Sequence, residues 1–330
     1  MNIPPVTVLL PVRNGERWIA DSVRSLATQT YSSIEILLVD DGSTDRTVAI
    51  ARDCAGSKLR VVQGDGRGVA SALSLGVREA SSEIVLRLDA DDVAEPDRVR
   101  RQVEYLQSHP DCVLLGSDAT LISAANQVVG EISHPRDHDA ISLRMCVMTA
   151  FVHPSVAFRR SAVLEAGNYR GINNGAFAED FDLWSRLESV GRLANLPEKL
   201  VRYRLSPGSI TKVHWPALAR SAGAIATSNL TRRLGLPAAP QEMQGLLTLF
   251  HLRDRRIHAS RNAAAGGVAR ACADAVRPAQ ASRRVHVGRL CPAPILVDSV
   301  TQSSHPLASD RQPVERKQVT RVSTRIFELI

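Results

Sequence analysis

The sequence predicts an α/β fold with a Rossmann-like, mostly parallel sheet flanked by helices. Over residues 1–120, short β-branched apolar runs alternate with segments whose apolar residues recur at helical spacing. This alternation is typical of parallel strands joined by crossover helices. Each apolar run also ends in polar residues. In an open α/β sheet the carboxyl ends of the strands form the edge where ligands bind.

Strands and helices can be assigned in order along this region. The expected strands cover residues 6–12, 34–42, 58–64 and 83–92. The expected helices cover residues 18–28, 43–51, 69–80 and 96–109. The second helix starts at a Ser-Thr-Asp cap, and the fourth opens with Pro96 in its first turn. Farther along, we expect a strand pair over 113–123 and 128–133, and helices over 160–166 and 180–190.

The chain changes character after residue 212. We expect one domain over residues 1–212, with a nucleotide-binding half at about 5–120 and an acceptor half at about 121–212. A helical extension is expected over 213–254, with a break at the Gly-Leu-Pro of 235–237. Residues 255–330 are rich in Ala, Arg, Ser, Pro and Gln without amphipathic periodicity, which predicts a poorly ordered basic tail.

The net charge of +7 is concentrated in this tail. Residues 251–330 contain 14 Lys and Arg against 6 Asp and Glu, whereas residues 1–250 contain 27 against 28. A nucleic-acid-binding domain carries its basic residues on a folded face, often interleaved with aromatic residues, and aromatics make up only 4% of this chain. We therefore expect no nucleic-acid partner, although binding through the basic tail remains an alternative hypothesis.

The cysteines and the hydropathy pattern favour a reducing compartment. Five cysteines are scattered without any CxxC spacing, which argues against a disulfide framework or a thiolate metal site. The first residues lack a signal-peptide pattern, and no stretch approaches the ~20 apolar residues of a membrane span. The expected location is cytoplasmic, with peripheral contact at the inner face of the membrane as a further hypothesis.

Three carboxylates follow the fourth expected strand, at Asp89, Asp91 and Asp92. Adjacent carboxylates repel one another and raise each other's pKa, so a cation that neutralises them is a simple explanation for the cluster. Mg²⁺ and Mn²⁺ bind carboxylate oxygens and are often completed by substrate phosphates. The alternative is that these residues cap the helix or turn before Pro96.

Two other strand ends deliver polar side chains to the same edge. Asp40 begins the DDGSTD segment after the second strand, and Arg13 and Glu16 follow the first strand in PVRNGE. Arg13 can serve as a phosphate partner or as an ordinary solvated arginine. DDGSTD is also a good turn and cap by itself. The GDGRG segment at 64–68 does not match the GxGxxG pattern of a dinucleotide site.

A fourth acidic segment, AEDFDLW at 178–184, opens an expected helix. Acidic residues are stabilised at a helix N-terminus by the helix dipole, which is one explanation for the segment. The functional alternative is a general base, because a hydroxyl is a poor nucleophile until a carboxylate takes its proton.

The motifs PVRNGE, VDDGSTD, RLDADD, HPSVAFRR and AEDFDLWSRL, in this order over residues 5–212, resemble the family-two glycosyltransferases of the GT-A fold. The resemblance implies a nucleotide diphosphate sugar donor, a saccharide or lipid-linked acceptor hydroxyl, and single displacement with inversion. It also implies a role in the synthesis of cell-surface polysaccharides or glycoconjugates, and a Mg²⁺ or Mn²⁺ cofactor.

The resemblance assigns roles to individual residues. Nucleotide-pocket roles fall on Pro11, Arg13, Glu16 and, for the base, Asp40. Asp89 and Asp91 match the DxD metal pair, with Asp91 as the direct ligand and Asp89 nearer the ribose. Asp180 matches the catalytic base, with Glu179 beside it.

The sequence departs from the family pattern at two places. Many relatives have an arginine in the helix after the third strand, where residues 70–74 read ASALS, so Arg67 is the replacement diphosphate contact that we expect. Relatives often have a histidine after the YR segment, where this chain has Leu205 and Ser206. His153, in the recurrent HPS segment, is expected to be structural. A nucleotidyltransferase or another nucleotide-sugar enzyme is the main alternative, because it would use the same metal edge without a base in AEDFDLW.

Overall fold

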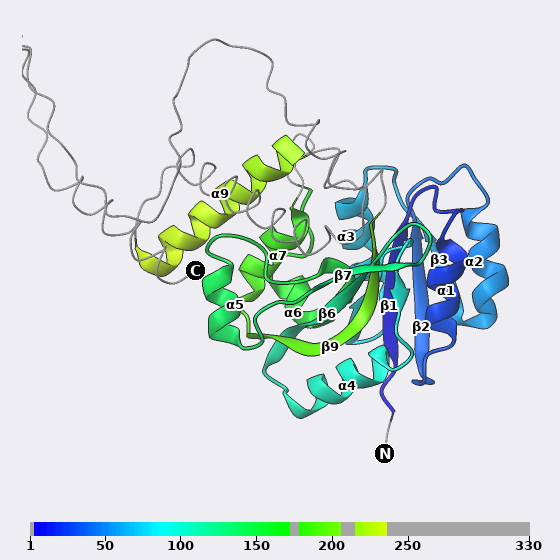
Figure 1. Ribbon diagram of the computed structural model, residues 1–330, viewed down its shortest axis with the longest axis horizontal. Helices are drawn as coiled ribbons and strands as arrows, with labels where there is room; N and C mark the ends of the chain where they lie inside the picture. Colours follow the sequence, from blue (N-terminus) through cyan, green and yellow to red (C-terminus); the bar gives the residue numbers. More distant parts are fainter. Residues whose placement is uncertain (1–2, 172–177, 206–214, 236–330) are drawn as a thin grey trace, which may run out of the picture. The chain divides into compact units, whose positions relative to one another are not determined.

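The computed structural model describes residues 3–171, 178–205 and 215–235 (Figure 1). All of them belong to the unit formed by residues 1–266. The expected basic tail at 255–330 lies outside the described residues, as does most of the helical extension beyond Gly235.

The first half of the fold is a parallel sheet of four strands. These are β1 (Val6–Val12), β2 (Ile34–Asp40), β3 (Leu59–Gln63) and β4 (Ile84–Arg87), in the order β3-β2-β1-β4. Val12 is paired with Asp40, and Asp40 is paired with Gln63, so the three strands end at the same level. This alignment brings the polar residues that follow each strand to one edge of the sheet.

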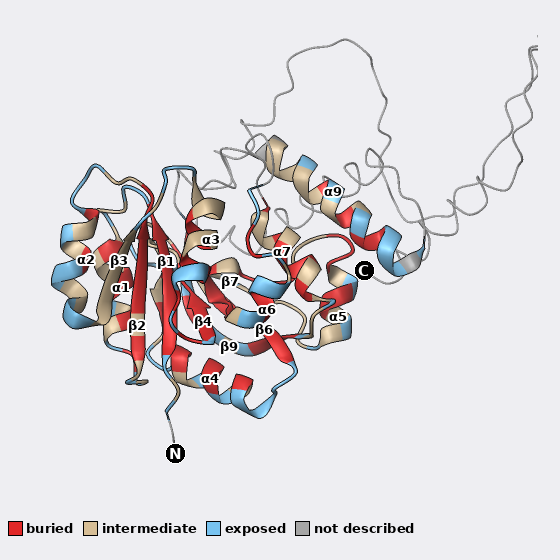
Figure 2. Ribbon diagram, turned by 180° about the vertical axis from the view of Figure 1, so that it is seen from behind, coloured by how far each residue is buried: buried red, intermediate tan, exposed pale blue. Residues whose placement is uncertain are grey.

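Helices cover both faces of this parallel sheet. They are α1 (Ile19–Ala27), α2 (Thr47–Ala55), α3 (Val69–Glu79) and α4 (Arg98–Ser108), with a 3-10 turn, η1 (Gly56–Lys58), after α2. Buried side chains of α1, α2 and α4 form one cluster with alternate residues of the strands, such as Val8 and Leu10. On the other face, α3 approaches β1 so closely that a Cβ at Gly76 would lie 2.1 Å from Leu9. Because both faces are covered, β1 and β2 are buried along their length (Figure 2).

The second half extends the sheet in mixed orientation. Its strands are β5 (Val93–Ala94), β6 (Cys112–Ile122), β7 (Val128–Ile132), β8 (Ala157–Arg159) and β9 (Arg192–Arg204). Strand β8 is antiparallel to both β4 and β6, and β9 runs parallel to β6 and antiparallel to β5. The order β4-β8-β6-β9-β5 therefore continues the first sheet, with β7 paired to β6.

Short helices connect the strands of the second half. They are α5 (His138–Arg144), the 3-10 turn η2 (His153–Ser155), α6 (Arg160–Glu165) and α7 (Glu179–Leu187), followed by α9 (Trp215–Leu234). Asn229 of α9 donates hydrogen bonds to Ser185 of α7 and to the carbonyl of Met145. Gly235, with φ of 63°, follows the last residue of α9, at the beginning of the expected Gly-Leu-Pro break.

The structure confirms the α/β fold and the expected strand pair, now β6 and β7, but it corrects several boundaries. Strand β4 ends at Arg87, and the segment after it turns, with the amide of Asp92 bonded to the carbonyl of Asp89. Helix α2 begins at Thr47, and Asp45 of the expected cap accepts a hydrogen bond from the Thr47 amide at 3.0 Å, whereas Ser43 and Thr44 bond to Asn14. Helix α4 begins at Arg98, after Pro96 rather than with it.

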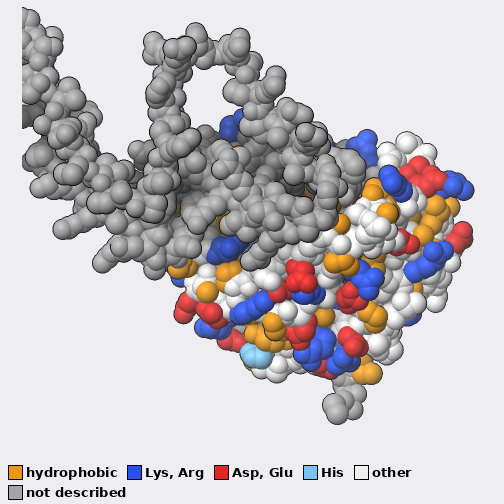
Figure 3. Space-filling model, viewed as in Figure 1, with side chains coloured by type: hydrophobic (Ala, Val, Ile, Leu, Met, Phe, Trp, Pro, Cys, Tyr) orange, Lys and Arg blue, Asp and Glu red, His pale blue; other side chains and the backbone are white. Residues whose placement is uncertain are grey.

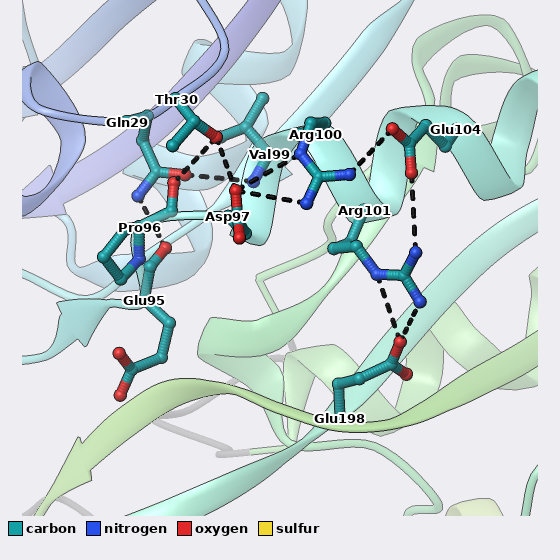
Figure 4. A network of polar contacts seen from close by, with 10 residues as sticks. All are labelled: Gln29, Thr30, Glu95, Pro96, Asp97, Val99, Arg100, Arg101, Glu104 and Glu198. Atoms are coloured by element: carbon teal, nitrogen blue, oxygen red, sulfur yellow. Dashed lines mark hydrogen bonds and ion pairs between the residues drawn. The ribbon is translucent and has the colours of Figure 1, made fainter.

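The start of α4 bears on the expected role of the acidic cluster. The side chain of Gln29 accepts a hydrogen bond from the amide of Val99 and donates one to the carbonyl of Glu95 (Figure 4). Asp97 accepts hydrogen bonds from Thr30 and Arg100. These residues hold the N-terminus of α4, so the acidic cluster does not cap this helix, although it does lie in a turn before Pro96, as the other half of that alternative states.

Strands β5, β8 and β9 and helix α5 were not predicted. Strands β5 and β8 have two and three residues, too few for a periodic pattern to show. In β9, the register against β6 jumps from Leu196 to Lys199, and Pro197 lies in this bulge. Proline in a strand is tolerated at such bulges, but in a sequence it argues against a strand. Among the described helices, none is both long and apolar enough to cross a bilayer.

Candidate active site

The carboxyl edge of β2 is fixed by two buried aspartates. The carboxylate of Asp40, which is 4% exposed, accepts hydrogen bonds from the amide of Ser43 at 3.1 Å and from Gln63 at 3.4 Å. Asp41 accepts hydrogen bonds from the amides of Gly66 at 2.9 Å and Gly68 at 2.8 Å. Asp41 therefore holds the turn after β3, while Asp40 lies at the edge that the sequence predicted.

The loop after β1 is tied to the loop after β2. Asn14, with φ of 53°, accepts a hydrogen bond from the amide of Thr44 at 2.9 Å. Glu16 forms an ion pair with Arg46 at 2.6 Å and accepts a hydrogen bond from the Arg46 amide. These bonds to Arg46 lower the pKa of Glu16. In this arrangement Glu16 joins the two loops.

The other expected nucleotide contacts lie at the same edge without contacting one another. Pro11 is buried in β1 opposite Val39, and Arg13 is exposed at the end of that strand. The side chain of Arg67 is 78% exposed and forms an ion pair with Asp65. The guanidinium of Arg67 is thus in solvent, beside the turn that Asp41 holds.

The acidic cluster lies in the turn after β4. Carboxylate oxygens of Asp89, Asp91 and Asp92 lie within 4.8 Å of one another. Both oxygens of Asp89 bind the guanidinium of buried Arg87, one of them at 2.9 Å. Asp92 is 1% exposed, and its Oδ1 accepts a hydrogen bond from the Arg204 amide at 2.7 Å. Its Oδ2 is buried without a hydrogen-bond partner among the described residues.

Burial makes the negative charge of this cluster costly. Loss of water, followed by repulsion from Asp89, raises the pKa of Asp91 to about 6. Burial raises the pKa of Asp92 well above its usual range. Burial and the three carboxylates also raise the pKa of Tyr203, the penultimate residue of β9. The unpartnered oxygen of Asp92 and the crowded carboxylates fit a hard divalent cation, which prefers oxygen ligands.

The C-terminal residue of β9 supports the turn that carries the cluster. Arg204 donates through Nε to the carbonyl of Asp91 at 2.6 Å and through Nη1 to the side chain of Asn126 at 2.6 Å. Its guanidinium also lies 5.5 Å from the ring centroid of Trp18. Arg204 and Arg87 are the main support of the acidic turn, and neither was identified as a site residue from the sequence.

A second acidic pair lies at the start of α7. Ala178, the N-cap residue, has φ of 95° and ψ of 33°, a left-handed conformation that is rare for a residue with a side chain. It directly precedes Glu179 and Asp180. Oδ1 of Asp180 accepts a hydrogen bond from the amide of Phe181 at 2.7 Å. The unusual backbone at Ala178 thus sets the direction in which the two carboxylates leave the helix.

The two acidic groups lie close enough to affect each other. Burial, followed by repulsion from Asp180, raises the pKa of Glu179 to about 7. Burial also raises the pKa of Asp180, and the nearby Arg87 partly opposes the shift while Asp89 adds to it. Arg87, which binds Asp89 in the turn after β4, is therefore also close enough to the start of α7 to affect both carboxylates there. The charge of Arg87 acts on four of the residues that the sequence singled out, Asp89, Asp91, Glu179 and Asp180.

Two open grooves lie elsewhere in the fold. Both are lined by Asp111, His138 and Arg192, near the starts of β6 and β9. None of the expected site residues lines either groove. The chemistry of the acidic residues, rather than groove size, locates the candidate site at the other ends of these strands.

Known proteins resemble this chain both in sequence and in fold. The family model described as Glycosyl transferase family 2 matches residues 7–166. The amylovoran biosynthesis glycosyltransferase AmsE of Erwinia amylovora is 30% identical, over 62% of this chain and 78% of its own length. Among solved structures, S. aureus TarS in complex with UDP-GlcNAc has a TM-score of 0.56 at 17% identity, over 74% of this chain and 71% of TarS. The mannosyltransferase PcManGT from Pyrobaculum calidifontis, in complex with GDP-Man and Mn²⁺, has a TM-score of 0.51 at 20% identity, over 83% and 79% of the two chains.

Proposed function

Because the chain belongs to glycosyl transferase family 2, we propose that this glycosyltransferase moves a sugar from a nucleotide diphosphate donor to an acceptor hydroxyl, with inversion. We propose a saccharide or lipid-linked acceptor and a role in polysaccharide synthesis, as the name of AmsE suggests for that relative. A lipid-linked acceptor would place the enzyme at the cytoplasmic face of a membrane as a peripheral protein. The proposed catalytic domain is residues 1–212, with the donor half at about 5–120.

One observation carries the proposal. The buried guanidinium of Arg87 binds Asp89 in the turn after β4 and also lies near the acidic pair at the start of α7, a segment far away in the sequence. Acidic side chains from two remote segments thus lie within electrostatic reach of one arginine. This convergence supports a donor site that faces an acceptor base, because displacement requires both groups to be held in one place.

We propose that Asp91 holds Mg²⁺ or Mn²⁺, with the unpartnered Oδ2 of Asp92 as a further ligand and Asp89, fixed by Arg87, nearer the ribose and the metal edge. The bound cation would supply charge stabilisation for the departing diphosphate. The likeness in fold to a mannosyltransferase solved with Mn²⁺ supports this choice of cofactor.

We propose Asp180 as the base that removes the proton of the acceptor hydroxyl, with Glu179 beside it. The raised pKa of Asp180 supports this role, since a carboxylate with a higher proton affinity is a better base near neutral pH. In the nucleotide pocket we propose Pro11, Arg13 and Asp40, with Asp40 contacting the base of the donor.

Glu16 and Arg67, which we place in the same pocket, are each already paired with another side chain. Glu16 would act by holding the two loops through Arg46, because its carboxylate is already engaged there. Arg67 would leave Asp65 to contact the diphosphate, and its exposed position makes that exchange inexpensive in free energy.

The main rival, a nucleotidyltransferase, predicts a different product. Purified protein supplied with UDP- or GDP-sugars and Mn²⁺ should release nucleoside diphosphate, whereas a nucleotidyltransferase would produce or consume pyrophosphate. Asp180→Asn should slow this release by ~10²–10⁴-fold. Asp182→Asn is the matched control, because Asp182 lies in the same helical turn but pairs with Arg186. Pyrophosphate as the product, or equal rates for the two variants, would reject the proposal.

The second rival, nucleic-acid binding through the basic tail, falls on residues outside the described ones, and the described face seen in Figure 3 offers no other basic surface. Basic and acidic side chains are interspersed there. A basic surface that binds nucleic acid gathers its charges in one area.

A further inference from the structure

We infer that His153 is a positioning residue for the base: its imidazole orients the carboxylate of Asp180, and the hydroxyl of Tyr169 fixes which ring nitrogen carries the proton. This inference rests on the proposed function, because it assumes that Asp180 is the base.

The geometry links three side chains from separate segments. Nδ1 of His153, the first residue of η2, lies 4.0 Å from Oδ2 of Asp180. Nε2 of the same ring lies 3.1 Å from the hydroxyl of Tyr169. The ring of His153 also lies edge-on to the buried Trp184, with centroids 5.7 Å apart at 84°. Trp184 therefore packs against the imidazole and Tyr169 binds its Nε2, while Nδ1 faces Asp180.

The partners determine the tautomer. A carboxylate can only accept a hydrogen bond, so orienting Asp180 requires the proton on Nδ1, the nitrogen that faces it. Nε2 is then an acceptor, and the hydroxyl of Tyr169 donates to it. Tyr169 is 3% exposed, and its hydroxyl has no other hydrogen-bond partner among the described residues. Its hydroxyl is thus committed to His153.

The histidine acts as a neutral group. Burial, and then the nearby Arg87, hold the pKa of His153 well below its usual value. The charged groups near the ring include Arg87 from β4 and the carboxylate of Asp180 from α7, and Glu179 and Asp89 act on its partner Tyr169. A neutral imidazole orients Asp180 without forming an ion pair that would weaken it as a base.

The two oxygens of Asp180 have different surroundings. Oδ1 is bound by the amide of Phe181, so Oδ2 is left to meet an acceptor hydroxyl. Oδ2 is also the oxygen that faces His153. At 4.0 Å the contact is longer than a hydrogen bond, and a shift of about 1 Å would close it. Catalytic hydrogen bonds are often long without substrate and tighten in the complex.

Two substitutions of His153 separate orientation from packing. His153→Asn keeps a side-chain N–H near the place of Nδ1, whereas His153→Gln keeps one near the place of Nε2. We expect His153→Asn to retain kcat within about threefold and His153→Gln to lower kcat about 10- to 100-fold, with the donor KM unchanged in both. The probe is nucleoside diphosphate release from UDP- or GDP-sugars with Mn²⁺, together with the thermal midpoint of each variant.

A conservative variant keeps the test decisive if either substitution disturbs folding. Tyr169→Phe removes only the hydroxyl, and we expect it to lower kcat about 3- to 10-fold at constant donor KM. Equal kcat for the Asn and Gln variants, or wild-type kcat for Tyr169→Phe, would overturn the inference. If Asp180→Asn itself retained wild-type kcat, the proposed base would fail instead. In the Asp180→Asn background, His153→Gln should have no further effect on kcat, and an additional loss would also overturn the inference.

Discussion

Asp91→Asn should stabilise the protein without metal at pH 8, although it removes a residue proposed as essential. Burial and Asp89 raise the pKa of Asp91 from 3.8 to about 6. The folded state therefore binds this proton more tightly than the unfolded chain. The stability that this bound proton contributes is complete below pH 3.8 and is lost as the pH rises through about 6. At pH 8 the ionised carboxylate therefore opposes folding.

The size of the effect follows from the shift. The pKa of Asp91 is 3.8 in the unfolded chain and about 6 in the folded protein. At 1.36 kcal/mol for each pH unit between these values, the gain in stability from removing the charge has a ceiling of ~3 kcal/mol. Asp91 is only partly buried, and solvent screening reduces the expected gain to ~1–2 kcal/mol. An asparagine can still accept the local backbone hydrogen bond, so the substitution removes mainly the charge.

The assay is urea unfolding at pH 8 and at pH 4, each with and without Mn²⁺. Without metal, Asp91→Asn should exceed wild type in free energy of unfolding at pH 8, and the difference should shrink at pH 4. Mn²⁺ at 100 times its dissociation constant should stabilise wild type by ~2.7 kcal/mol and the variant much less.

Asp97→Asn is the matched control for this prediction. Its carboxylate is exposed and bound by Thr30 and Arg100, which lower its pKa, so the same substitution should not stabilise the protein at pH 8. The reasoning would be refuted if Asp91→Asn without metal were less stable than wild type at pH 8. It would also be refuted if Mn²⁺ stabilised wild type and Asp91→Asn equally.

Three further predictions concern the base, the turn after β3 and the packing of α3. Because the base must be ionised and burial raises the pKa of Asp180 above its usual value of 3.8, kcat/KM should fall at a higher pH than for an ordinary aspartate; a profile that falls only near 3.8 would contradict this. Asp41→Ala should release two glycine amides and lower the free energy of unfolding in urea by ~2–4 kcal/mol, and a loss below ~1 kcal/mol would show that the turn holds without it. Gly76→Ala should cost ~1–3 kcal/mol in thermal unfolding, because its Cβ would lie 2.1 Å from Leu9, and unchanged stability would argue against this close approach.

The parallel half of the fold could be predicted from the sequence because its strands are buried on both faces. Strands β1 and β2 are therefore continuous apolar runs, each followed by polar residues at the ligand edge. In the mixed half the sequence predicted β6 and β7 but not β5, β8 or β9. In β9, Pro197 interrupts a strand that continues past it through a bulge, and such an accommodation depends on the partner strand.

The acidic side chains of the site could be predicted, but their supports could not. Asp91 and Asp180 lie in segments that place several carboxylates close together, and such a cluster requires a partner or a function in any fold. Arg87 and Arg204 have the sequence pattern of ordinary strand arginines, and only the fold shows that both are buried against the acidic groups. An arginine inside the apolar run IVLRL was a signal that could have been noticed, since buried charges need partners.

The most direct test of a metal-held donor facing a single base is the anomeric configuration of the sugar first released from the donor. NMR at early times, with enough enzyme to hydrolyse an α-linked nucleotide sugar with Mn²⁺ faster than the product mutarotates, should show the β-anomer, because one displacement inverts the reacting carbon. Initial release of the α-anomer would contradict the account, since retention would require chemistry that one base opposite one leaving diphosphate does not supply.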